Sequence, residues 1–203
     1  CQRLGQPRLK VAANLAEMEA LTGEQVSRWD GYLAAIAQRR EVFRTIGGAT
    51  ATDHGHPTAQ TADLTPVQCQ ALLDRVRRGT PSAADAELFR AQMLTEMAKM
   101  SCADGMTMQL HPGSWRNHNQ RLFEQYGHDR GADIPTQTGY VAQLKPLLDR
   151  LGDRPDLTLI LFTLDESAYA RELAPLAGHY PCLRLGPAWW FHDSPEGMRR
   201  FRE

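Results

Sequence analysis

Three features are scarce in this sequence of 203 residues: cysteine, net charge of one sign and long apolar runs. The four cysteines form no CxxC pair, so we expect a reduced, cytoplasmic setting. A formal net charge of −1 argues against a nucleic-acid or membrane-surface binder, because binding to phosphate groups needs an excess of Lys and Arg. The longest apolar stretch, residues 157–162, is too short to cross a bilayer. With 42% hydrophobic residues, the chain can still build a sizeable core.

Several common motifs are also absent from the sequence. It contains no GxGxxG, no P-loop and no GxSxG, so dinucleotide, NTP and nucleophile-elbow chemistries lack support. The chain starts at Cys1 rather than Met and shows no signal-like apolar run near that end. We therefore expect an internal fragment of a longer protein.

Short β-like runs alternate with helical patterns along most of the chain. The run at 157–163 lacks polar alternation, which is typical of a strand buried on both faces of a parallel sheet. Alternating strands and helices predict an α/β fold with right-handed crossovers. We expect residues 1–46 to form a helical segment that leads into residues 47–203, which contain the sheet. The expected strands are 47–52, 106–110, 157–163 and 182–186.

Helix boundary signals occur at several places in the sequence. Thr65 followed by Pro66 is typical of a helix start, and Gly79 of its end. Ser82 is expected to cap a longer helix. A further helix should end at Gly152.

Each expected strand runs directly into a polar or aromatic cluster. Parallel α/β folds bind ligands at the carboxyl ends of their strands. Four such clusters therefore predict one shared ligand-binding site at that edge of the sheet, which is called the mouth below. The clusters are residues 53–58, 111–119, 164–167 and 186–193.

The first cluster, DHGH, is open to two interpretations. His54 and His56 could bind zinc, because alternate residues of an extended segment point the same way. Turn chemistry around Gly55 and Pro57 explains the same residues equally well. Asp53 is the better candidate to face the mouth.

The second cluster, HPGSWRNHN, is rich in hydrogen-bonding side chains. His111 ends its strand and should point into the mouth, although a histidine bound to a backbone carbonyl is the alternative. Arg116 could hold a carboxylate through two parallel hydrogen bonds. Asn117 and Asn119 could bind sugar hydroxyls or brace the loop. In the last cluster, Trp190 is a candidate to lie against a sugar face, with loop packing as the alternative.

Four segments together resemble uronate isomerase (glucuronate isomerase), a family of the amidohydrolase superfamily. They are TATDHGHPT, GMTMQLHPGSWRNHNQRLF, LTLILFTLDESAYARELA and LRLGPAWWFHDSPEGMRR, and the resemblance runs from about Trp29 to the C-terminus. It implies a partial (β/α)₈ TIM-type barrel, roughly strands four to seven with their helices. It also implies interconversion of D-glucuronate with D-fructuronate, and of D-galacturonate with D-tagaturonate.

The resemblance carries over to named residues only in part. Asp53 and His111 match active-site residues of the family, and Arg116, Asn117 and Asn119 match its motif. Family members carry a divalent metal, usually zinc, on an HxH pair of the first strand and an Asp after the last strand. Neither element is in this chain, so we expect no tightly bound metal and no activity from residues 1–203 alone.

The resemblance implies a small uronate as the substrate. We expect no nucleic-acid partner and no membrane partner. A homo-oligomer of the complete enzyme is compatible with the sequence. Two other functions remain open at the sequence level. One is a metal-dependent amidohydrolase that acts on a small carboxylated substrate. The other is a non-catalytic sugar-acid binding module.

Overall fold

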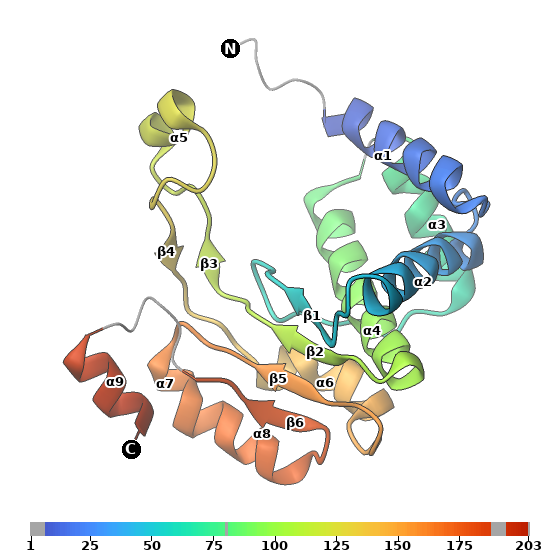
Figure 1. Cartoon of the computed structure of the whole chain (residues 1–203). Coiled ribbons are helices and arrows are strands. Elements are labelled where there is room, and N and C mark those ends of the chain that lie inside the picture. The colour runs from blue at the N-terminus through green and yellow to red at the C-terminus, as the bar shows by residue number, and fades with distance from the viewer. Residues whose placement is uncertain (1–6, 80, 188–193, 203) are drawn as a thin grey trace. The chain divides into compact units, whose positions relative to one another are not determined.

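The computed structural model describes residues 7–79, 81–187 and 194–202 (Figure 1). The chain divides into two compact units. One consists of Cys1–Thr50 and Thr61–Met100 and is called the helical unit here; the other consists of Ala51–Gln60 and Ser101–Glu203 and is called the sheet unit. The division expected from the sequence, between residues 46 and 47, stays a prediction.

The helical unit is built from α1 (Pro7–Thr22), α2 (Trp29–Thr45), α3 (Pro66–Arg77) and most of α4 (Ala83–Asp104). Its core contains Trp29, Cys69 and Leu73, against which Tyr32, Leu33, Leu64, Phe89 and Met93 pack.

The predicted helix starts in this unit are confirmed by hydrogen bonds. Thr65 Oγ1 accepts from Gln68 N at 3.4 Å, and Gln68 Oε1 accepts from Thr65 N at 2.9 Å, which together form a capping box. Ser82 Oγ accepts from Asp85 N at 3.0 Å before α4 begins. These bonds satisfy backbone N–H groups that have no partner within a helix.

The sheet unit contains four parallel strands in the order β1-β2-β5-β6, side by side in Figure 1. In chain order they are β1 (Ala51–His54), β2 (Thr107–Leu110), β5 (Leu159–Leu161) and β6 (Leu183–Leu185), one within or overlapping each predicted run. Apolar side chains of β2, β5 and β6 are buried; Met108, Leu110, Leu159, Leu161 and Leu183 are all at most 1% exposed. The strand and helix alternation expected from the sequence is confirmed.

Helices connect the later strands of the sheet unit. α6 (Val141–Leu151) precedes β5, and Gly152 is its C-cap residue, as predicted. Between β5 and β6 the chain forms α7 (Glu166–Ala168), a π-helical turn at Tyr169–Leu173 and α8 (Ala174–His179). The described part of the chain ends with α9 (Pro195–Arg202).

A short hairpin follows β2 and was not predicted. Its strands, β3 (Ser114–Trp115) and β4 (Ile134–Pro135), pair antiparallel, and α5 (Gln120–Tyr126) lies between them. Gly113 precedes β3 with φ of +94°, and a Cβ atom there would overlap Thr138 Oγ1. Glycine is therefore required at the base of the hairpin.

No helix among residues 7–79, 81–187 and 194–202 combines the length and the apolar character that a membrane span requires.

Tyr140, the N-cap residue of α6, forms a hydrogen bond just after β5. This bond allows a test of what stabilises the sheet unit. Tyr140 is fully buried, and its hydroxyl donates to the Phe162 carbonyl at 3.0 Å. Tyr140→Phe leaves that carbonyl without its donor, so we expect a loss of about 1–3 kcal/mol in the free energy of unfolding. Urea denaturation of both proteins measures it.

Tyr126→Phe is the matched control, because Tyr126 is 55% exposed on α5. It should change the free energy of unfolding by no more than about 0.5 kcal/mol. Equal effects of the two variants would contradict a stabilising role for the Tyr140 hydrogen bond.

Candidate active site

The structure brings Asp53 and His111 into direct contact. β1 and β2 are adjacent and parallel, with Asp53 opposite Gln109 and His54 opposite Leu110. His111 follows β2. Its backbone N–H donates to the His54 carbonyl at 2.9 Å and so continues the hydrogen-bond ladder between β1 and β2. His111 Nδ1 then lies 2.5 Å from Asp53 Oδ1. Backbone pairing thus places an imidazole and a carboxylate together at the carboxyl ends of two strands.

The ring of His111 is also fixed from one face. It stacks on Phe162, with ring centroids 3.9 Å apart and planes 18° from parallel. Phe162 follows β5, and its N–H donates to the Leu110 carbonyl at 3.0 Å. A Cβ atom at Gly186 would overlap the Phe162 ring, so a larger residue there would push that ring out of place.

The carboxylate and the stacked ring together determine the chemistry available to His111. A neutral imidazole that donates Nδ1–H to Asp53 carries its lone pair on Nε2. The side chain of His111 is 11% exposed and that of Asp53 is 69% exposed, so Asp53 is the more accessible of the two groups. The pair has the arrangement expected of an oriented proton acceptor, or of a metal ligand with a carboxylate partner.

His54 and His56 do not form a metal centre with other described side chains. Their ring centroids are 6.3 Å apart, and His54 Nε2 lies 3.0 Å from Thr52 Oγ1. No group of three or more His, Cys, Asp or Glu residues that could hold a metal occurs within residues 7–79, 81–187 and 194–202.

Arg116 is held by a carboxylate that the sequence did not reveal. Its Nη1 donates to Asp133 Oδ2 at 2.7 Å, and Asp133 Oδ1 accepts from the backbone N–H of Asn117 at 2.8 Å. The Asp133 side chain is 6% exposed, whereas that of Arg116 is 49% exposed. Arg116 Nη1 also lies 4.0 Å from Asp129 Oδ1, so the half-exposed guanidinium is paired with one buried and one exposed carboxylate. No sequence signal marks Asp133, which is one acidic residue in a polar stretch.

The structure gives the two asparagines bracing contacts within the hairpin. Asn117 adopts a φ of 55° and its Oδ1 accepts from Asp129 N at 3.3 Å. Asn119 caps α5, with its Oδ1 accepting from Leu122 N at 3.1 Å. Trp190, the remaining predicted site residue, lies outside the described residues.

A cavity of about 460 Å³ adjoins the hairpin and includes Arg116 in its wall. The volume lies within the range of about 300–1,000 Å³ that is typical of small-molecule sites. Its wall is formed by Pro57, Ser114, Trp115, Arg116 and Thr136.

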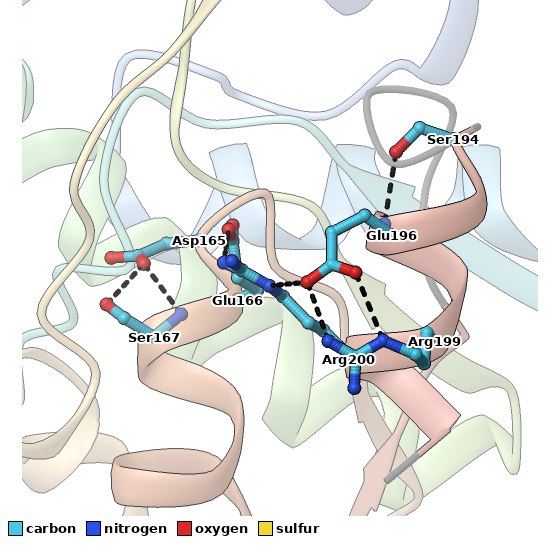
Figure 2. Close-up of polar contacts among 8 residues, drawn as sticks. Asp165, Glu166, Ser167, Ser194, Glu196, Arg199 and Arg200 are labelled. Carbon is cyan, nitrogen blue, oxygen red and sulfur yellow. Dashed lines mark hydrogen bonds and ion pairs between the residues drawn. The ribbon is translucent and has the colours of Figure 1, made fainter.

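A second polar cluster joins α7 to α9, as Figure 2 shows. Arg200 donates to Glu166 Oε1 at 2.9 Å and to Glu196 Oε1 at 2.8 Å, and Arg199 donates to both oxygens of Glu196. The hydrogen bonds from Arg199 and then Arg200 hold the pKa of Glu196 below its usual range. Glu196 is thus an ionised, paired carboxylate, and we assign this cluster a structural role.

Comparisons with known proteins identify the family to which the sequence is similar. The family model for glucuronate isomerase matches residues 8–202. The uronate isomerase of Xanthomonas euvesicatoria is 67% identical over 192 residues, which are 95% of this chain and 40% of that protein. The uronate isomerase of Phenylobacterium zucineum is 65% identical over 191 residues, covering 94% and 40% respectively. This chain therefore spans about two-fifths of the length of these relatives.

Solved structures give the same result for the fold. A crystal structure of glucuronate isomerase from Caulobacter crescentus aligns with a TM-score of 0.88 at 60% identity, covering 93% of this chain and 39% of that one. A uronate isomerase from Thermotoga maritima aligns with a TM-score of 0.83 at 26% identity. The alignment covers 92% of this chain and 41% of that one. The predicted partial (β/α) barrel is confirmed, and the chain belongs to the glucuronate isomerase family.

Proposed function

We propose that this chain supplies part of the active site of a uronate isomerase. The enzyme would interconvert D-glucuronate with D-fructuronate, and D-galacturonate with D-tagaturonate. The observation that carries this proposal is the contact of 2.5 Å between His111 and Asp53 at the carboxyl ends of adjacent parallel strands. In barrel enzymes that end of the strands holds the catalytic groups.

The proposed reaction explains why an oriented imidazole is useful. An aldose and its ketose differ in the positions of two hydrogens: one proton passes between the oxygens on C2 and C1, and another moves between C2 and C1 through an enediol. The enzyme must accept and return this proton and must stabilise charge on the neighbouring oxygens. His111 would hydrogen-bond the reacting oxygens, while Asp53 would orient the imidazole and contact substrate hydroxyls. The principal base is not assigned to a residue of this chain.

Arg116 would hold the carboxylate at the other end of the uronate. Arg116 lines the cavity of about 460 Å³, and its side chain is 49% exposed. The hydrogen bond to Asp133 would fix its orientation, at the cost of partly neutralising its charge. A planar guanidinium retains further N–H groups for a carboxylate after this one bond.

A divalent metal, zinc, is proposed for the complete enzyme, where it would polarise the substrate's oxygen atoms. The residues described here do not form a metal site by themselves, because they include no suitable group of three or more ligands. His111 fits the role of a single ligand, since its Nδ1 is oriented by Asp53. The roles given to Asp53 and Arg116 do not depend on the metal.

A chimera tests the proposed activity directly. Residues 8–202, which match the family model, replace the corresponding segment of the Xanthomonas euvesicatoria uronate isomerase, a relative that is 67% identical over 192 residues. We expect the chimera to isomerise D-glucuronate, and residues 1–203 alone to show no turnover, because β1 and β6 are then edge strands. The measurement is fructuronate formation. A folded chimera that binds uronates without turnover would contradict the proposal.

Asp53→Asn in the same chimera tests the oriented imidazole. The amide keeps the shape of the side chain but removes the charge that faces His111 Nδ1. We expect kcat for D-glucuronate to fall at least tenfold, about 1.4 kcal/mol. Asp153→Asn, at an exposed loop position after α6, is the control and should leave kcat unchanged. A normal kcat in Asp53→Asn would remove Asp53 from the catalytic site.

Arg116→Lys tests the proposed carboxylate anchor. Lysine keeps the positive charge but loses the planar pair of donors, so we expect kcat/KM for uronates to fall tenfold or more, about 1.4 kcal/mol. Steady-state kinetics of the chimera measures this. Arg121→Lys, at an exposed position of α5, is the matched control. If the two variants behave alike, Arg116 only braces the hairpin.

A further inference from the structure

The imidazole of His111 has two contacts of different kinds. Asp53 Oδ1 holds its Nδ1, but one such bond does not fix the plane of the ring, because the last torsion of a histidine side chain is broad and the Asp53 side chain is 69% exposed. The second contact is with the ring of Phe162, at 3.9 Å between centroids and 18° between planes. A flat surface at this distance limits rotation of the imidazole about its own torsion.

The backbone of Phe162 is held on both sides of its Cα atom. Its N–H donates to the Leu110 carbonyl at 3.0 Å, and its carbonyl accepts from the Tyr140 hydroxyl at 3.0 Å. The first bond fixes Phe162 relative to β2, and His111 directly follows β2. The two stacked rings therefore keep their spacing for as long as β2 and β5 stay paired.

The side chain of Phe162 has a support of its own at Gly186. Gly186 follows β6, and its N–H donates to the Leu161 carbonyl at 2.8 Å. The three atoms nearest to a Cβ added at Gly186 all belong to the Phe162 ring, and two of them, Cδ1 and Cε1, would overlap it. Gly186 is not one of the residues with positive φ, so its backbone accepts alanine. The ring of Phe162, rather than the backbone, requires glycine here.

We infer that Phe162 is a positioning residue of the proposed isomerase, and that Gly186 fixes the place of its ring. This inference rests on the proposed function, in which His111 takes part in the reaction. Phe162 acts through His111: it holds the imidazole in one plane, so that Nε2 keeps one direction while Asp53 holds Nδ1. Proton transfer and charge stabilisation both depend on such a direction, and a misplacement of about 1 Å can lower a rate about a hundredfold.

Phe162→Leu in the chimera removes the flat ring and keeps an apolar side chain. We expect kcat for D-glucuronate to fall about tenfold and KM to stay within about twofold of the parent value, because orientation matters most in the transition state. Kinetics are measured well below the melting temperature of each variant, so that a loss of stability alone leaves kcat unchanged.

Phe123→Leu is the matched control for this variant. Phe123 is half-buried like Phe162, and its ring also contacts a histidine, His128, at 4.8 Å between centroids. It lies on α5 of the hairpin, outside the pair of Asp53 and His111. The control should leave both kcat and KM unchanged.

Gly186→Ala tests the support of the ring. The added methyl group displaces the Phe162 ring, so kcat should fall about tenfold. Leucine at position 162 is shorter and has already lost the stack, so adding Gly186→Ala to Phe162→Leu should lower kcat by no more than about a further twofold. Gly178→Ala is the control, because an added Cβ there meets no atom within 4 Å, and it should leave kcat unchanged.

The possible outcomes are distinguishable. A parent chimera without isomerase activity overturns the proposed function, and this inference with it. If the parent is active, a normal kcat in Phe162→Leu overturns the inference alone, and so does a change confined to KM. Losses that multiply in the double variant overturn it as well, because Gly186→Ala would then act by a route that does not involve the Phe162 ring.

Discussion

The pairing of β1 with β2 is the constraint on which the rest of the candidate site depends. Asp53 and His111 are 58 residues apart in the sequence, and the parallel register brings their side chains to 2.5 Å. A shift of one residue in this register would turn the side chains of one strand to the opposite face. The buried Met108 and Leu110 resist such a shift, because it would expose them. Core packing therefore fixes the geometry of the candidate site.

The strands and their carboxyl ends were predictable because their signals are local. Apolar runs such as residues 157–163 are typical of buried parallel strands, and a polar cluster after each run identifies the carboxyl end. The N-cap at Thr65 was predictable for the same reason, since a side chain three residues away completes it. Asp53 and His111 could thus be placed at one edge from the sequence.

The hairpin could not be predicted, because nonlocal contacts stabilise it. β3 and β4 have two residues each, too few for any periodic pattern, and α5 has no buried residue and so no core-facing stripe. The ion pair between Arg116 and Asp133 spans 17 residues and leaves no mark in the sequence. The roles of Asn117 and Asn119 were left open for the same reason, since their partners lie in the folded hairpin.

In the proposed function, residues of the sheet would bind one end of the uronate, and a residue of the hairpin would bind the other end. His111 and Asp53 belong to the backbone ladder of the sheet, where hydrogen bonds and the stacked Phe162 ring limit movement. Arg116 directly follows β3 in a short antiparallel hairpin held by its own hydrogen bonds. Proton transfer requires reacting atoms to be positioned within a few tenths of an ångström, about 0.5 Å, whereas recognition of a carboxylate tolerates more adjustment. The roles proposed for the sheet and for the hairpin therefore match the demands of proton transfer and of carboxylate recognition.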